Sequence, residues 1–300
     1  MINRRQFMGG MAAAAFAPTE STCAGTLLRR TVPSSGASIT AIGMGTWLTF
    51  DVIDSEHELA IRTRVLDAFF SGGGELIDSS PMYGSSEAAI GECLSRLEGE
   101  KPLFSAGKVW TIGRWLGTKQ MQHSMKLWRQ SRIDLMQVHN LLDWKAHLST
   151  LRAWKAEGHI RYIGLTTSHG RRHRDIVEIM KAEPVDFVQI SYNILDREAE
   201  REILPVAMSR GIAVIANRPF QSSRLFDRVR NKPLPGWGQE INCRNWAQVF
   251  LKFILSHRGV TCTIPATSRV DHMVENMGAL TGSLPDPSLR RRIVDDYLNI

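Results

Sequence analysis

The stretch Ile133-Asp134-Leu135-Met136-Gln137-Val138-His139 is followed, one helix length later, by Ile160-Arg161-Tyr162-Ile163-Gly164-Leu165-Thr166. Both are short, mainly apolar runs of the length of a buried strand. Between them Leu148, Leu151 and Trp154 recur at the spacing of one helix face. Two strands joined through a helix predict a parallel pair with a right-handed crossover.

The same alternation of strand and helix patterns continues in both directions. Six further strands are predicted at Gly43–Trp47, Glu75–Asp78, Leu103–Lys108, Phe187–Ile190, Ile212–Ala216 and Thr261–Ile264. Eight strands alternating with helices predict an α/β fold, a (β/α)8 TIM barrel forming a single domain over residues 26–300. An open doubly wound sheet is the alternative, but the G-x-G-x-x-G turn that it favours after its first strand is absent.

Two segments lie outside the repeat. Leu28–Val32 and Ala37–Ala41, linked through Pro33 to Gly36, predict an N-terminal β-hairpin that caps the bottom of the barrel. The stretch from Arg218 to Arg244 is rich in proline and glycine and shows no clear period. It follows the seventh strand, so we expect a long functional loop at the barrel mouth.

Residues 1–25 have the character of a targeting segment. Arg4 and Arg5 precede the short apolar run Gly9–Ala17, which is too short for a stable membrane span. The segment resembles a bacterial twin-arginine (Tat) export signal. It implies a periplasmic or exported protein that folds in the cytoplasm first and has the Tat export machinery as a partner.

The charge of the chain is moderately basic, with a formal net charge of +7. Its densest runs, Arg171–Arg174 and Arg290–Arg292, fall in predicted helices and are interpreted as solvated helix faces. We therefore expect no nucleic-acid partner. No heptad or long apolar exposed helix stands out, so no oligomeric state is predicted.

Metal and disulfide signals are weak. The four cysteines show no C-x-x-C spacing, so neither a metal site nor a disulfide is predicted. His169 and His173 are four residues apart, a metal-ligand spacing on a helix, but no third ligand stands at a comparable spacing. A metal-dependent barrel hydrolase remains an alternative on that pair alone.

Three consecutive predicted strands end in residues that carry chemistry. Asp78, Lys108 and His139 close the second, third and fourth strands, and Tyr83 lies in the loop after Asp78. Functional residues of barrel enzymes gather at the carboxyl ends of the strands. We therefore expect these four side chains at one rim.

Their chemistry is that of proton transfer. The Lys108 ammonium should lower the pKa of Tyr83, and Asp78 should hold Lys108 in place. His139 can donate a hydrogen bond to a carbonyl oxygen on which negative charge develops. Because the set contains no electron source, a hydride has to come from a cofactor.

The segment from Ile77 to Glu87, with the sequence IDSSPMYGSSE, resembles the active-site signature of the aldo-keto reductases. The likeness covers nearly all of the chain after the targeting segment, in the expected order. It extends over Gly43–Trp47, Lys108, Asp134–His139, Gln189–Asn193, Ile264–Thr267 and Glu275–Asn276.

The resemblance implies an NAD(P)(H)-dependent oxidoreductase that transfers a hydride between nicotinamide and a carbonyl/alcohol substrate. Tyr83 would be the general acid/base, tuned by Lys108 and Asp78, and His139 would orient the carbonyl. The implied substrate-binding residues are Trp47, Tyr83, Trp110, His139 and Asn140. The implied cofactor-binding residues are Gly45, Thr46, Trp47, Asp78, Thr166, Thr167, Gln189, Asn217, Arg218, Pro219, Phe220, Ile264, Ala266, Thr267, Ser268, Arg269, His272, Glu275 and Asn276.

The chain departs from the family pattern around the cofactor. Thr166 and Thr167 stand where Ser-Asn commonly holds the nicotinamide amide, and Asn217 stands where a tyrosine often stacks on the ring. Ala266 replaces the common lysine of the phosphate site. Arg269 can pair with a 2′-phosphate, which favours NADP(H) with NAD(H) as the alternative.

The leading hypothesis is thus a carbonyl reductase or alcohol dehydrogenase. The altered cofactor residues leave open a nicotinamide-binding redox sensor or accessory subunit with little turnover.

Overall fold

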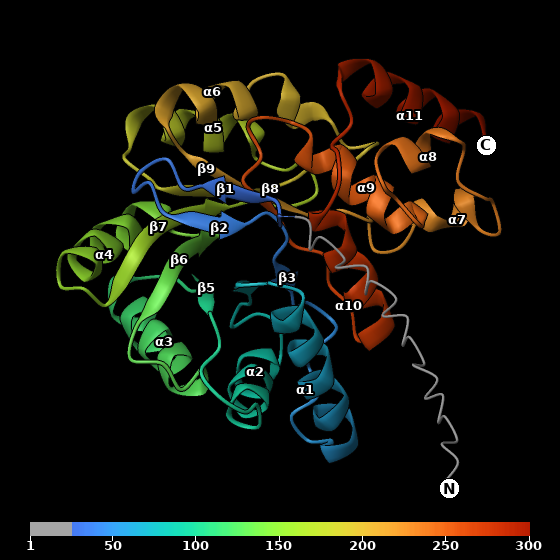
Figure 1. The fold of residues 1–300 in the computed structure, drawn as a ribbon. Helices are drawn as coiled ribbons and strands as arrows, with labels where there is room; N and C mark the ends of the chain where they lie inside the picture. Colours follow the sequence, from blue (N-terminus) through green and yellow to red (C-terminus); the bar gives the residue numbers. More distant parts are fainter. Residues whose placement is uncertain (1–25) are drawn as a thin grey trace, which may run out of the picture.

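The computed structural model describes residues 26–300, and the predicted export segment lies outside them (Figure 1). Eight parallel strands form one sheet in chain order, and β3 meets β10 through bridges between Ile42 and Thr263 and between Gly45 and Ala266. The strands are β3 (Met44–Gly45), β4 (Leu76–Asp78), β5 (Phe104–Val109), β6 (Ile133–His139), β7 (Ile160–Thr166), β8 (Phe187–Ser191), β9 (Ala213–Asn217) and β10 (Cys262–Thr263). The predicted barrel is confirmed, and the open doubly wound sheet is excluded.

Helices surround the barrel (Figure 1). They are α1 (Glu56–Ser71), α2 (Ser86–Ser95), α3 (Arg114–Leu127), α4 (Trp144–Ala156), α5 (His173–Ala182), α6 (Ile203–Arg210), α7 (Leu225–Val229), α8 (Trp237–Glu240), α9 (Trp246–Leu255), α10 (Val270–Met277) and α11 (Pro287–Asn299). Side-chain caps mark several starts, as where the Ser55 side chain accepts a hydrogen bond from the Glu58 backbone N–H before α1.

The N-terminal hairpin pairs β1 (Arg29–Thr31) with β2 (Ser38–Thr40). Its buried Val32 and Ile39 pack in one cluster with Phe104 and Phe187, which begin β5 and β8. The hairpin therefore caps the amino-terminal ends of the strands, as expected.

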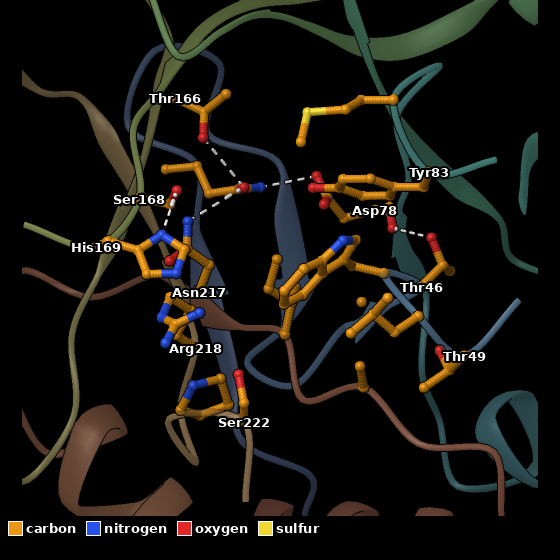
Figure 2. Close-up of a pocket in the computed structure, with 18 of the residues that line it drawn as sticks. Thr46, Thr49, Asp78, Tyr83, Thr166, Ser168, His169, Asn217, Arg218 and Ser222 are labelled. Carbon is orange, nitrogen blue, oxygen red and sulfur yellow. Dashed lines mark hydrogen bonds between the residues drawn. The ribbon is translucent and has the colours of Figure 1, made fainter. Parts of the chain in front are cut away.

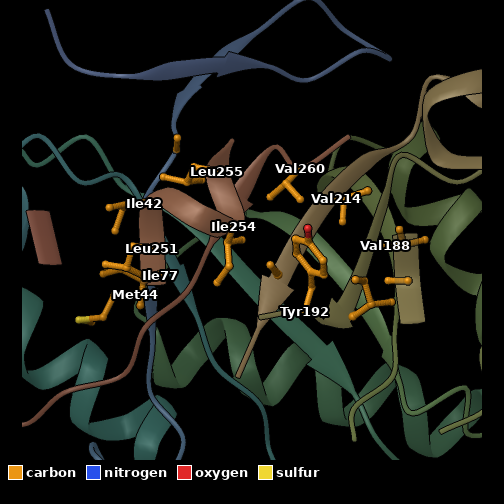
Figure 3. Packing of buried hydrophobic residues seen from close by; sticks show 14 of the residues in the cluster. Ile42, Met44, Ile77, Val188, Tyr192, Val214, Leu251, Ile254, Leu255 and Val260 are labelled. Atoms are coloured by element: carbon orange, nitrogen blue, oxygen red, sulfur yellow. The ribbon is translucent and has the colours of Figure 1, made fainter. Parts of the chain in front are cut away.

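The core between the barrel and its helices is apolar and continuous. Figure 3 shows Val188 and Val214 of β8 and β9 in the same packed layer as Leu251 and Ile254 of α9. All four side chains are fully buried. This packing holds the strand ends, and the side chains that they carry, in fixed positions.

The segment after β9 is more ordered than expected. It contains the short helices α7 and α8, whose few turns are too brief to show a helical period in sequence. Trp237 of α8 is buried and donates from Nε1 to Asp296 in α11, at 2.7 Å. The long loop after β9 is present as expected, but it is not irregular throughout.

The basic runs also differ from expectation. Arg171 and Arg172 precede α5, and Arg172 donates to the carbonyl oxygens of Asn140 and Leu141, at 3.0 and 3.3 Å. Arg290 lies in α11 but bonds Tyr192 and Glu200 through one guanidinium nitrogen. These arginines join loops and helices instead of forming purely solvated faces.

Cys93, Cys243 and Cys262 are buried free thiols. No helix between residues 26 and 300 combines the length and the hydropathy needed to cross a bilayer.

Candidate active site

A cavity of about 370 Å³ opens at the carboxyl ends of the strands (Figure 2). Most of the residues predicted for the site line it. They are Gly45, Thr46, Trp47, Asp78, Tyr83, His139, Asn140, Thr166, Gln189, Asn217, Arg218, Pro219, Phe220, Ile264 and Ala266.

Parallel pairing explains this convergence. Gly45 is in register with Asp78, and His139 with Thr166, at the ends of neighbouring strands. Lys108 is in register with Gln137 one layer deeper. Side chains that are far apart in sequence therefore meet at one rim.

A buried ion pair lies beneath the cavity. Lys108 Nζ is 2.5 Å from Asp78 Oδ2 and donates to the Ser79 carbonyl oxygen at 2.9 Å. The other Asp78 oxygen accepts from the amide nitrogens of Gln137 and Gln189, at 3.0 and 2.7 Å. With both partners buried, the carboxylate is held by three donors and cannot leave Lys108 without cost.

Tyr83 lies over this pair, with Lys108 Nζ 5.1 Å from the centre of its ring. Burial raises the pKa of Tyr83, and the opposing effect of Lys108 is smaller. Lys108 thus acts in the expected direction, but burial outweighs it, and the pKa of Tyr83 lies above its usual value. The partly buried phenol therefore keeps its proton at neutral pH.

His139 completes the group. Its ring meets Tyr83 edge-on, with centroids 5.8 Å apart, and its Nδ1 is 2.8 Å from Ser80 Oγ. Burial, reinforced by Lys108, lowers the pKa of His139 to about 3. The imidazole is therefore neutral over the physiological range.

Trp110 stands beside this group without lining the cavity. Its ring centre is 6.4 Å from that of His139, and the side chain is half-exposed. Gln120 holds its main chain by bonds to both N–H and C=O. Trp110 thus extends the rim outward from His139.

The inner wall of the cavity is a ladder of amides and hydroxyls (Figure 2). Gln189 Oε1 accepts from Thr166 Oγ1 and Asn217 Nδ2, at 3.2 and 3.4 Å. Asn217 also donates to the Thr167 carbonyl oxygen and accepts from Ser191 Oγ. Asn217, which stands in place of the tyrosine of the family pattern, therefore links β8 and β9 through polar bonds.

The residues expected around the adenosine end do not line the cavity. Three of these residues lie in the turn before α10, namely Thr267, Ser268 and Arg269. The other three lie on α10 itself, namely His272, Glu275 and Asn276. Thr167 is likewise outside the lining. Exposed Arg269 is paired with Asp271 through its guanidinium group.

The cavity also contains residues that were not predicted. They are Leu48, Thr49, Met82, Ser168, His169, Ser222 and Ser223. Each follows a strand end within a few residues. Met82 also lies in the signature from Ile77 to Glu87, and Ser222 and Ser223 lie in the Arg218–Arg244 loop expected at the barrel mouth. Gln137 was missed as a partner of Asp78, although it lies two residues before His139 and so shares its face of the strand.

His169 and His173 do not form a metal centre. His169 lines the cavity, whereas His173 Nδ1 lies 3.3 Å from Glu198 Oε2. Throughout residues 26–300, no group of three or more His, Cys, Asp or Glu side chains is placed to hold a metal ion.

The model of the Aldo/keto reductase family matches residues 41–291. Methylglyoxal reductase YeaE of Escherichia coli is 24% identical over 262 residues, which are 85% of this chain and 90% of the relative. A solved aldo-keto reductase from Bacillus halodurans, in its holo form, superposes with a TM-score of 0.74 at 19% identity, over 91% of this chain and 96% of that one. An aldo-keto reductase from Klebsiella pneumoniae in complex with NADPH gives 0.73 at 20% identity, with the same coverage. The chain therefore belongs to the aldo/keto reductase family.

Proposed function

We propose that this protein is an NAD(P)(H)-dependent carbonyl reductase or alcohol dehydrogenase. The observation that carries the proposal is the placement of the Tyr83 phenol above the Lys108–Asp78 ion pair and beside the His139 imidazole at one cavity. The Klebsiella pneumoniae relative described with NADPH, and a relative named NADH-specific methylglyoxal reductase, support a nicotinamide cofactor of either kind.

The residues present fit a dinucleotide. Arg218 lines the cavity, and partial burial lowers its pKa, an effect that the nearby Asp196 carboxylate offsets only in part. Such a cation suits a diphosphate. Thr167 Oγ1 is buried and finds no partner in the described part of the chain, beside the Asn217 amide, which suits a ligand that carries an amide.

A bound nicotinamide supplies or accepts the hydride. Residues of the chain bind the substrate carbonyl oxygen and transfer the proton to it. His139 binds the carbonyl oxygen and stabilises the negative charge that develops there, and Tyr83 donates its proton to the same oxygen. Lys108 favours the resulting phenolate, and Asp78 keeps the ammonium in position. Alcohol oxidation runs these proton movements in reverse.

The pH profile of reduction should be flat across neutrality. Reduction needs protonated Tyr83, whose pKa is raised above its usual value, so kcat should fall only above about pH 10. Because His139 titrates at about 3, no inflection should occur near its ordinary pKa. A pH–rate profile of kcat tests both expectations. A transition in kcat with its midpoint between about pH 6 and 8 would contradict the protonation states given to Tyr83 and His139.

Cofactor choice should depend on Arg269. If this side chain leaves Asp271 to bind a 2′-phosphate, Arg269→Ala should weaken NADPH binding about tenfold or more. NADH binding should not change, because NADH lacks that phosphate. Fluorescence titration of both cofactors measures the difference, and equal losses for the two would exclude the NADP(H) preference.

The rim favours apolar substrates. Large exposed apolar side chains gather in the loops after β3, β4 and β5 and in the first turn of α3. They are Trp47, Leu48, Met82, Trp110, Ile112, Trp115 and Leu116. In a panel of straight-chain aldehydes, kcat/KM should rise about two- to fourfold per added CH2 until the rim is covered.

This panel, run with NADPH and NADH, is the direct test of the proposed function. Cofactor binding without turnover of any aldehyde or ketone would instead support the redox-sensor alternative. The observation that favours that alternative lies on the inner wall of the cavity, where Gln189 and Asn217 hydrogen-bond one another and are not free to bind a cofactor amide. Turnover that is indifferent to chain length would leave the function intact and exclude the apolar preference.

A further inference from the structure

Ser80 is a buried residue of the loop after β4 that makes two side-chain hydrogen bonds. Its Oγ is 2.8 Å from His139 Nδ1 and accepts from the Met82 backbone N–H at 3.2 Å. The Ser80 side chain has no exposed surface, and that of His139 is 5% exposed. Neither bond involves Lys108 or Asp78 of the ion pair below.

The direction of the Ser80–His139 bond follows from the inventory of donors. A hydroxyl has one hydrogen and two acceptor positions, and the Met82 N–H occupies one acceptor position. Within residues 26–300, His139 Nδ1 is the remaining partner of Ser80 Oγ and the only acceptor for its hydrogen. If Nδ1 carried the proton instead, the buried hydroxyl hydrogen would have no acceptor, which is unfavourable.

We propose that Ser80 is a positioning residue: its hydroxyl donates to His139 Nδ1 and thereby holds the imidazole as the tautomer protonated on Nε2. A neutral imidazole has a single N–H, so the tautomer decides whether the other nitrogen donates or accepts. Nε2 makes no hydrogen bond to any residue between 26 and 300, and the ring lines the cavity. The free N–H is therefore available to a carbonyl oxygen.

The low pKa of His139 makes this control necessary. A protonated imidazole would donate from both nitrogens whatever Ser80 did, but burial keeps this ring neutral. Without the Ser80 hydroxyl, the Nδ1–H tautomer would present a lone pair to the carbonyl oxygen and repel it. Ser80 thus acts on the substrate only through His139.

Nitrogen-15 NMR of the histidine rings tests the tautomer directly, without cofactor or substrate. The chain has nine histidines, and the His139 signals are identified by their loss in His139→Gln. In the wild-type protein we expect a protonated Nε2 and an unprotonated Nδ1. In Ser80→Ala, Nδ1 loses its donor, and both signals should move toward the average of a mixed population. A wild-type Nδ1–H tautomer, or an unchanged ratio in Ser80→Ala, would overturn the proposal.

Ser86→Ala is the matched control. Ser86 is also a fully buried serine of this region, and its hydroxyl hydrogen-bonds Ser79 Oγ and not His139. Its removal should leave the His139 spectrum as in the wild type. If both alanine variants shift the spectrum alike, the effect is a general loosening of the loop, and the proposal fails.

The kinetic consequence rests on the proposed function. Ser80→Ala should lower kcat for aldehyde reduction about tenfold, less than the loss expected on removing an oxyanion donor outright. Cofactor affinity should stay the same, because Ser80 does not line the cavity. A wild-type protein without turnover would refute the proposed function and leave the NMR result standing. Unchanged kcat together with a shifted tautomer would refute the kinetic role of Ser80.

Discussion

Tyr83→Phe is expected to reduce kcat by about 10²- to 10⁴-fold, the range of a lost general acid. The substitution removes the hydroxyl that donates the proton and keeps the ring that packs against His139 and over Lys108. NADPH affinity should therefore be nearly unchanged. Steady-state kinetics with a reactive aldehyde and fluorescence titration of NADPH separate the two effects.

Tyr162→Phe is the control for this substitution. Tyr162 is buried and lies among Phe104 and Phe187 at the hairpin end of the barrel, with its hydroxyl 2.7 Å from Ser35 Oγ. Loss of the Tyr162 hydroxyl should lower the free energy of unfolding by about 1 kcal/mol and leave kcat unchanged. A Tyr83→Phe protein as active as Tyr162→Phe would refute the role given to Tyr83.

Asp78→Asn should lower the free energy of unfolding by about 3–5 kcal/mol, the cost of breaking a buried pair. The Lys108 ammonium has no exposed surface and would be left without a counter-charge. Turnover should be lost as well, because the ammonium would no longer be held beneath Tyr83. Urea unfolding and aldehyde kinetics measure the two losses.

The double variant Asp78→Asn/Lys108→Met shows whether the loss of stability comes from an unpaired charge or from altered packing. It removes both charges, so much of the stability should return while turnover stays lost. Asp227→Asn breaks the exposed pair with Arg230 and should leave the urea midpoint unchanged. Equal destabilisation by the single and double variants would show that the cost lies in packing and not in an unpaired charge.

The barrel could be predicted because each strand is buried and short and is separated from the next by a helix with a clear apolar face. β6 and β7 match their predicted bounds, whereas β10 covers only Cys262–Thr263 of the predicted Thr261–Ile264. At this closing seam, isolated bridges replace a regular ladder. Which residues pair there depends on the closure of the whole sheet, and sequence periodicity does not report it.

The rim residues could be predicted from strand ends, but their electrostatics could not. The pKa of Tyr83 depends on how fully the loop after β4 buries the phenol, and that burial outweighs Lys108. Likewise, Asn217 was noted as a departure from the family pattern, while its bonds to Ser191 and Thr167 become visible only when β7, β8 and β9 lie side by side. Contacts across strands are long-range, so no local motif encodes them.

The position of the β1–β2 hairpin suggests a site for immobilising this protein or fusing it to a partner. It closes the end of the barrel opposite the cavity, and the described chain begins there, at Thr26, with Leu27 close to Gly73 in the turn between α1 and β4. A resin, an electrode or a fusion partner joined just ahead of Thr26 would thus meet the closed end. The mouth would face the bulk solution, so such immobilisation should leave substrate access unobstructed.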